Sequence, residues 1–166
     1  MARYKGAAEE AFSSTAADIP AARCMGRSRG GLTTKIHAVV DANGNPITLR
    51  LSAGQAHDSR SAADMLGSVT AGQTLLGDGG YDSDALRASV AERGAWANIK
   101  PHPRRVNVPP FNRYLYRFRN LVERFFNKLK HLRAIATRYE KHDANYLALV
   151  KLAAIRIWLR FNESVS

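Results

Sequence analysis

The sequence has little cysteine, few acids and no long apolar run. Its 166 residues include a single cysteine, Cys24, so the chain can form neither an internal disulfide nor a zinc site built from several thiolates. No apolar stretch approaches the roughly 20 residues of a membrane-spanning helix, and the first residues lack the apolar core of a secretory signal peptide. These absences favour a protein of the reducing cytoplasm that has no membrane partner.

Acids are scarce relative to bases. Asp and Glu number 14 against 25 Lys and Arg, which gives a formal net charge of +11. A soluble domain this basic usually binds a polyanion, most often nucleic acid. Twelve basic residues lie between Lys100 and Lys141, accompanied only by Glu123 and Glu140. The distribution predicts a near-neutral scaffold followed by a segment that faces nucleic acid. A third interpretation, a ribosome- or RNA-associated domain, is supported by the net charge alone.

The periodicity of apolar residues alternates between strand and helix after residue 31, which favours an α/β or α+β layered domain. Residues 1–31 have weak periodicity, and we expect an irregular segment with a short helix near Ala7–Phe12. Residues 32–141 are expected to form the main domain and 142–166 a C-terminal helix packed on it. The expected elements are strands over 32–41 and 46–54 around an Asn-Gly turn, a helix over 58–66, a strand over 74–77, a helix over 83–93, a strand over 95–100, and helices over 112–138 and 143–161.

Asp78 directly follows the short strand expected over 74–77 and precedes two glycines. A carboxylate at the carboxyl end of a buried strand lies where open α/β sheets hold their ligands. An aspartate in a turn also commonly caps the following helix. The residues alone leave both roles open.

The stretch YRFRNLVERFFNKLK, residues 116–130, predicts a basic helix with one acid, Glu123. At about 100° per residue, Tyr116, Arg119, Glu123 and Lys130 share one face. Arg119 precedes Glu123 by four residues, so a structural ion pair is available, and a metal-ligand role is the other interpretation. The expected core stripe consists of Phe118, Val122, Phe125 and Leu129.

The spacing of Tyr116, Arg119, Glu123 and Lys130 resembles the Tyr-Arg-Glu-Lys signature of bacterial insertion-sequence transposases of the DDE class. The segment LLGDGGYDSDALR resembles the region that holds the second catalytic aspartate in that family. The preceding segment, GRSRGGLTTKIHAVVDANGNPITLRLSAGQAHDS, looks like its counterpart in the insertion-sequence-five group. The resemblance runs in continuous register over residues 26–141.

The resemblance implies an α/β fold with a ribonuclease H-like mixed sheet flanked by helices, and DNA cleavage and strand transfer by phosphoryl transfer that depends on Mg²⁺ (or Mn²⁺). Asp78 and Glu123 would be the second and third metal-binding catalytic acids. Tyr116, Arg119 and Lys130 would contact the DNA of the transposon ends. The implied partners are double-stranded DNA, both ends and target, and further copies of the chain, in the bacterial nucleoid.

The proline-rich stretch PHPRRVNVPP, residues 101–110, holds four of the six prolines and is expected to be a loop or extended linker. Arg104 and Arg105 lie within it. We interpret them as DNA-contacting residues, with a solvated linker as the alternative.

The first of the three catalytic acids that the resemblance implies has no matching residue in this sequence. Asp18 lies outside any strand pattern, Asp41 begins a turn, and Asp58 is expected to cap a helix. The resemblance therefore implies a sheet that lacks its first, central strand. A polypeptide from an upstream frame, joined by ribosomal frameshifting, would supply it. We expect this chain alone to bind DNA without cleaving it, and a non-catalytic DNA-binding remnant or transposition regulator is the alternative.

Overall fold

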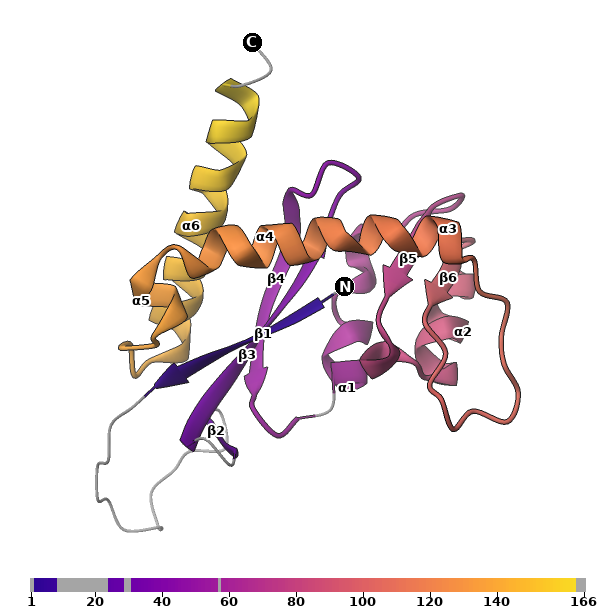
Figure 1. The fold of residues 1–166 in the computed structure, drawn as a ribbon, viewed down its shortest axis with the longest axis horizontal. Helices are drawn as coiled ribbons and strands as arrows, with labels where there is room; N and C mark the ends of the chain where they lie inside the picture. The colour runs from indigo at the N-terminus through magenta and orange to yellow at the C-terminus, as the bar shows by residue number, and fades with distance from the viewer. Residues whose placement is uncertain (1, 9–23, 29–30, 57, 164–166) are drawn as a thin grey trace.

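The computed structural model describes the chain except for residues 1, 9–23, 29–30, 57 and 164–166 (Figure 1). Its described strands form two sheets, one antiparallel and one parallel. The strands are β1 (Ala2–Ala8), β2 (Gly26–Ser28), β3 (Gly31–Val40), β4 (Pro46–Ala53), β5 (Thr74–Gly77) and β6 (Trp96–Ile99). The expected α/β class is confirmed.

The ten-residue strand β3 is the centre of the antiparallel sheet. It pairs with β4 through a hairpin whose Asn-Gly turn places Gly44 at φ 85°, a conformation that glycine adopts without strain. It also pairs with β1 in a register that sets Tyr4 against Ile36 and Ala8 against Leu32. The short strand β2 pairs with the start of β3. The hairpin is confirmed as predicted.

The irregular structure expected for the start of the chain is wrong over Ala2–Ala8, which form β1. This segment has no alternating apolar pattern. It is a strand because it hydrogen-bonds along β3, and such tertiary pairing overrides weak local preference. Most of the helix expected near Ala7–Phe12 lies outside the described residues.

The parallel sheet pairs β5 with β6, and Leu75 lies opposite Ala97. The connection between the two strands runs through a short 3-10 turn, η2 (Gly79–Tyr81), and the helix α2 (Asp84–Glu92). The Ser83 side chain caps α2 by accepting the Leu86 N–H, and Gly94 ends the unit at φ 69°. Both strands and this helix confirm the predicted elements.

The helix that carries the Tyr-Arg-Glu spacing crosses the molecule in front of both sheets (Figure 1). It is built from α3 (Arg113–Tyr116), the 3-10 turn η3 (Arg117–Arg119) and α4 (Asn120–Lys130), whose junction residues all keep right-handed helical backbone. It ends at Lys130 because Leu132 is extended, and α5 (Arg133–Ala136) follows. The single helix predicted over 112–138 is therefore too long at its carboxyl end.

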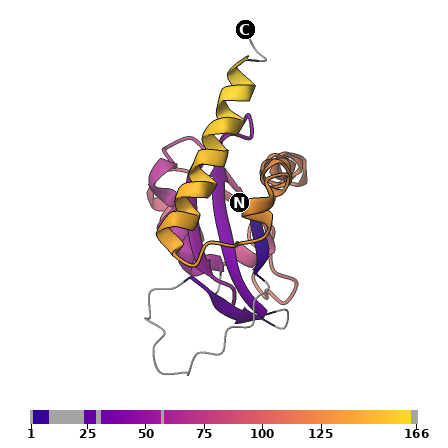
Figure 2. The same ribbon diagram turned by 90° about the vertical axis from the view of Figure 1, so that its left-hand side faces the viewer.

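The two faces of β3 contribute to two hydrophobic clusters. Ile36 and Ala38 pack with α4 and α6 (Asp143–Glu163), as the buried residues Phe125 and Val150 show. Val39, on the other face, packs with α1 (Asp58–Ala63), the turn η1 (Leu66–Ser68), β5, β6 and α2. Figure 2 shows α6 running along the outside of this arrangement. The strand β3 thus separates a helical half from the half that contains β5.

Phe118, which was expected in the core stripe, and two tryptophans are partly outside the core. Phe118 is 49% exposed, and Trp96 and Trp158 are each 38% exposed. Phe126 takes the place predicted for Phe118 in the buried stripe of the long helix. A helical wheel locates the apolar stripe of a helix. How far along the helix that stripe is buried depends on the neighbouring elements.

The buried contact between His37 and Tyr81 yields a prediction about stability. The His37 Nδ1 atom lies 3.0 Å from the Tyr81 hydroxyl, and both residues are fully buried. We expect Tyr81→Phe to lower the free energy of unfolding by about 1–3 kcal/mol, since it removes one partner of a buried polar contact. Urea denaturation measures the change. The control Tyr114→Phe, at a residue that is 62% exposed, should leave the stability nearly unchanged, and equal effects would contradict this interpretation.

Candidate active site

Asp78 lies at the carboxyl end of β5, as predicted, and begins the turn η2. Its Oδ1 atom accepts a hydrogen bond of 3.0 Å from the Gly80 N–H. The cap that the residues suggested is therefore present, on the 3-10 turn rather than on α2. Only one carboxylate oxygen is used by this bond, so the cap and a ligand role are compatible.

The long helix brings three predicted residues to the same place. The Arg119 guanidinium forms an ion pair with Glu123 and lies over the Tyr116 ring, 5.5 Å from its centroid. The Glu123 side chain is 50% exposed. An exposed i,i+4 pair of this kind contributes about 0.3–0.5 kcal/mol, so Glu123 can exchange Arg119 for a stronger ligand at little cost.

Both predicted catalytic acids affect the pKa of the Tyr116 hydroxyl. Burial raises the pKa of Tyr116, and the negative charges of Asp78 and Glu123 raise it further, while the Arg119 cation acts in the opposite direction. Asp78 and Glu123 are thus both near enough to act electrostatically on one side chain, although Asp78 follows β5 and Glu123 lies on α4. The helix segments that hold Tyr116 and Arg119 lie against β5, the strand that Asp78 follows.

A second carboxylate, Asp58, lies beside the Asp78 turn. Its Oδ2 atom and the Asp78 Oδ1 atom are each 3.2 Å from the point where a Cβ on Gly80 would lie. Its other oxygen pairs with the buried Lys35 ammonium at 3.0 Å. Asp58 begins α1, as the sequence predicted. The ion pair with Lys35 engages one of the two oxygens of Asp58.

Sequence reasoning missed the polar residues that support this turn. Lys35 and His37 alternate with Ile36 on β3, and all three are buried. The His37 ring lies 3.0 Å from the Tyr81 hydroxyl and 2.6 Å from the Ser52 hydroxyl. Lys35 also donates to the Ala56 carbonyl at 2.6 Å. The available signal was the pair of polar side chains on one face of a central strand, because buried polar groups require hydrogen-bond partners.

An apolar groove of about 410 Å³ adjoins the site. It lies between the end of β3 and β5, with the long helix as its third wall, and Arg119 reaches it from that helix. Its apolar lining includes Val39, Leu75, Phe118 and Val122. The partial exposure of Phe118 follows from its position in this groove.

The remaining predicted residues lie at the end of α4 and in the proline-rich loop. Lys130 is exposed at the end of α4, about two helical turns beyond Glu123. Arg104 is exposed in the proline-rich loop. Arg105 contacts Asp82 at 3.8 Å and forms an ion pair with Asp84. This arginine is therefore engaged within the protein, at the start of α2.

The site offers oxygen donors to the metal ion that the resemblance implies. Asp78 and Glu123 offer carboxylate oxygens, the ligand type that Mg²⁺ and Mn²⁺ prefer. Within the described ranges, no group of three His, Cys, Asp or Glu residues is placed to hold a metal ion. The donor chemistry fits, and the described part of the site supplies two acids.

Comparison with known proteins identifies the class of protein. The family described as "Transposase DDE domain" matches residues 11–158. The chain belongs to this family, the DDE transposases of bacterial insertion sequences. A particular relative is the "Putative transposase for insertion sequence element IS6501" of Brucella ovis (strain ATCC 25840 / 63/290 / NCTC 10512). It is 42% identical over 130 residues, which span 78% of this chain and all of the relative.

No solved structure matches the chain. Within the part of the chain that the structure describes, no helix is both long and apolar enough to cross a membrane.

The turn after Asp78 yields a prediction about pH. Burial alone would raise the pKa of Asp82. A 2.8 Å hydrogen bond from the His102 N–H and the Arg87 guanidinium outweigh burial, so the pKa is lowered. A lowered carboxyl pKa stabilises the fold above the unfolded value of about 3.9, and this stability is lost as the pH falls through the folded value. Asp82→Asn should therefore destabilise the protein more at pH ~7 than at pH ~3.

Urea denaturation of both proteins at the two pH values measures this difference. The exposed Asp64, whose side chain is 60% accessible, provides the control Asp64→Asn. A destabilisation by Asp82→Asn that is the same at both pH values would show that the charge of Asp82 is not responsible.

Proposed function

We propose that the chain carries out the metal-dependent phosphoryl transfer of an insertion-sequence transposase, with Asp78 and Glu123 as metal ligands. The observation that carries this proposal is the packing of the helix that holds Tyr116 and Arg119 against β5, the strand that Asp78 follows. Arg119 lines one groove together with Leu75 and Leu76 of β5. Residues 78 and 123 lie far apart in sequence and on different elements, yet both act electrostatically on Tyr116.

The proposed metal is Mg²⁺ or Mn²⁺. When bound, it would activate the attacking oxygen and stabilise the leaving oxygen at a DNA phosphate. Asp78 would hold it while Gly80 fixes the orientation of the carboxylate. Arg119 would orient Glu123, and its guanidinium would offer hydrogen-bond donors to phosphate. The weak Arg119–Glu123 pair supports this exchange of partners.

We also propose that the two sheets are parts of a ribonuclease H-like sheet. In that fold the first strand lies between the strands that correspond here to β3 and β5. The apolar groove lies between these same strands. Strand β1 already pairs with the edge of β3 opposite β4, which is where that fold places its first strand, but β1 carries no acid. A polypeptide from an upstream frame would therefore bring the third carboxylate.

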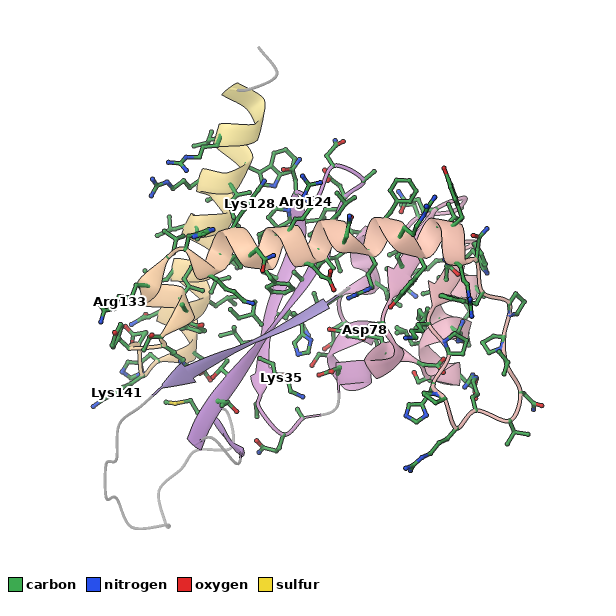
Figure 3. The ribbon with its side chains drawn as sticks, in the orientation of Figure 1. Lys35, Asp78, Arg124, Lys128, Arg133 and Lys141 are labelled. Carbon is green, nitrogen blue, oxygen red and sulfur yellow. The ribbon has the colours of Figure 1, made fainter. Side chains whose placement is uncertain are left out.

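The DNA would follow the outer face of the long helix. Arg117, Arg124 and Lys128 are exposed along it and lie on the side opposite the buried stripe. Figure 3 shows Arg124 and Lys128 above the helix, Asp78 below it, and Arg133 and Lys141 at its far end. Phosphate contacts of this kind supply affinity without sequence preference. Lys130 and Arg104 would extend the contact, in a nucleoid-associated cytoplasmic protein.

One alternative function is supported by a specific observation. The described residues offer two acids at the site, and Glu123 is paired with Arg119. A chain that binds transposon DNA without cutting it would serve as a regulator of transposition. The two functions share the DNA surface and differ in metal binding.

Metal binding tests the proposed acids. We expect the purified chain to bind Mn²⁺, detected by electron paramagnetic resonance, and Asp78→Asn or Glu123→Gln to weaken this binding at least ~10-fold because each removes a charged ligand. Both variants should keep their DNA affinity. The control Asp64→Asn should bind Mn²⁺ normally. Unchanged binding in the two site variants would contradict the ligand assignment and favour the regulator.

DNA binding tests the proposed surface. We expect the double variant Arg124→Ala, Lys128→Ala to reduce the slope of log K against log salt by about 2, because two phosphate contacts are lost. Fluorescence anisotropy with duplexes of two unrelated sequences measures the slope, and both duplexes should respond equally. The control Arg93→Ala removes an exposed arginine at the carboxyl end of α2, which donates a hydrogen bond to the Ser89 carbonyl of that helix. An unchanged slope in the double variant would place the DNA elsewhere.

A further inference from the structure

The helix α6 carries a second apolar stripe that faces away from the core. Leu152 is 63% exposed, Ile155 is 53% exposed and Leu159 is 58% exposed, and the small residue Ala148 is exposed in line with them. Large apolar side chains exposed in a row indicate an interaction surface, unlike apolar residues scattered singly. We call these four residues the α6 seam.

The α6 seam is distinct from the face that holds α6 to the body. The buried residues Val150, Ala154 and Ile157 lie on the opposite side of the helix and pack into the cluster that contains Ile36 and Phe125. Trp158 fixes the helix further by donating to the Pro46 carbonyl at 3.0 Å. The upper part of α6 extends beyond the sheets in both views (Figures 1 and 2). Among the described residues, none buries the seam.

The seam has coiled-coil spacing. Its residues follow one another at intervals of four, three and four, which is the a and d pattern of a heptad repeat. We propose that it binds the same seam of a second copy of this chain, with the two α6 helices antiparallel. Ala148 would pack against Leu159 of the second copy, and Leu152 against Ile155 of the second copy. An antiparallel pair of identical helices is related by a two-fold axis. The seam is compatible with this symmetry, because a small residue meets a large one at each end.

The charges that flank the seam select the antiparallel direction. Lys151 and Arg156 occupy the flanking g and e positions. In a parallel pair, g of one helix faces e of the other, so Lys151 would lie against Arg156 twice. In the antiparallel pair, Lys151 faces Trp158 and Arg156 faces Leu149 of the second copy. The half-exposed ring of Trp158 offers an aromatic surface to the lysine.

The size of the seam sets the strength of the contact. It covers about two heptads, fewer than the three or four that mark a self-sufficient coiled coil, and a small interface of this kind is typical of weak association. We therefore expect a dissociation constant on the order of 10–100 µM. This inference uses no metal and no DNA, so it is independent of the proposed function.

Sedimentation velocity of the full chain tests the dimer. Concentrations from about 5 to 300 µM cover the expected range, and salt of about 0.3 M screens the positive charge of the chain. We expect a monomer–dimer equilibrium that Leu152→Glu weakens at least ~10-fold, because the glutamate would be buried at the seam. The matched control Ala88→Glu places the same charge at an exposed position of α2 and should leave the dimer intact.

Disulfide cross-linking tests the direction of the helices. In a Cys24→Ser background, chains with Leu152→Cys and chains with Ile155→Cys are mixed and oxidised. We expect the mixed dimer to form at least ~5-fold faster than either homodimer, since only antiparallel packing brings residues 152 and 155 within the ~4.4–6.8 Å that a disulfide spans between Cα atoms.

Three results would overturn the proposal. They are a wild-type chain that stays monomeric over the whole range, a dimer that Leu152→Glu leaves unchanged, and homodimers of Leu152→Cys that form faster than the mixed dimer. A monomeric chain that binds vesicles of anionic lipid, and loses this binding in Leu152→Glu, would assign the seam to a membrane surface instead. Circular dichroism of each variant confirms that it is folded.

Discussion

The buried ion pair between Lys35 and Asp58 joins the two halves of the molecule. Lys35 comes from the central strand β3 and Asp58 from the start of α1, and both side chains are about 95% inaccessible. A buried charge without its partner would cost about 3–5 kcal/mol, so the sheet and α1 are held in one arrangement. The contact between His37, two residues further along β3, and Tyr81 joins the same two halves. The Asp78 turn lies between these two polar contacts.

The candidate site exists only because the halves are joined in this way. Asp78 belongs to the half that contains β5, whereas Glu123 belongs to a helix packed on the opposite face of β3. The long helix crosses both halves and brings Tyr116 within electrostatic reach of both acids. A site built from separate units can be altered without unfolding either, because each acid sits at the end or surface of a stable element.

Local patterns predicted the elements that depend on local chemistry. The hairpin around Gly44, the strand that ends at Asp78 and the capped helix α2 agree with the structure because turn residues, alternation and caps act over a few positions. Strand β1 was missed, since its residues carry no alternation and its pairing with β3 spans about 30 residues. The exposure of Phe118 was missed for a related reason, because the groove it lines is made by distant strands.

The sequence by itself determined the charge, the spacing of Tyr116, Arg119 and Glu123 on one helical face, and through these the family. Helix geometry fixes such spacing wherever the helix lies. Only the tertiary structure decided that this helix packs against β5, the strand that Asp78 follows, that Asp58 pairs with Lys35, and that one face of α6 is left exposed among the described residues. These outcomes depend on contacts between residues far apart in the chain, and packing of the two clusters on β3 sets them.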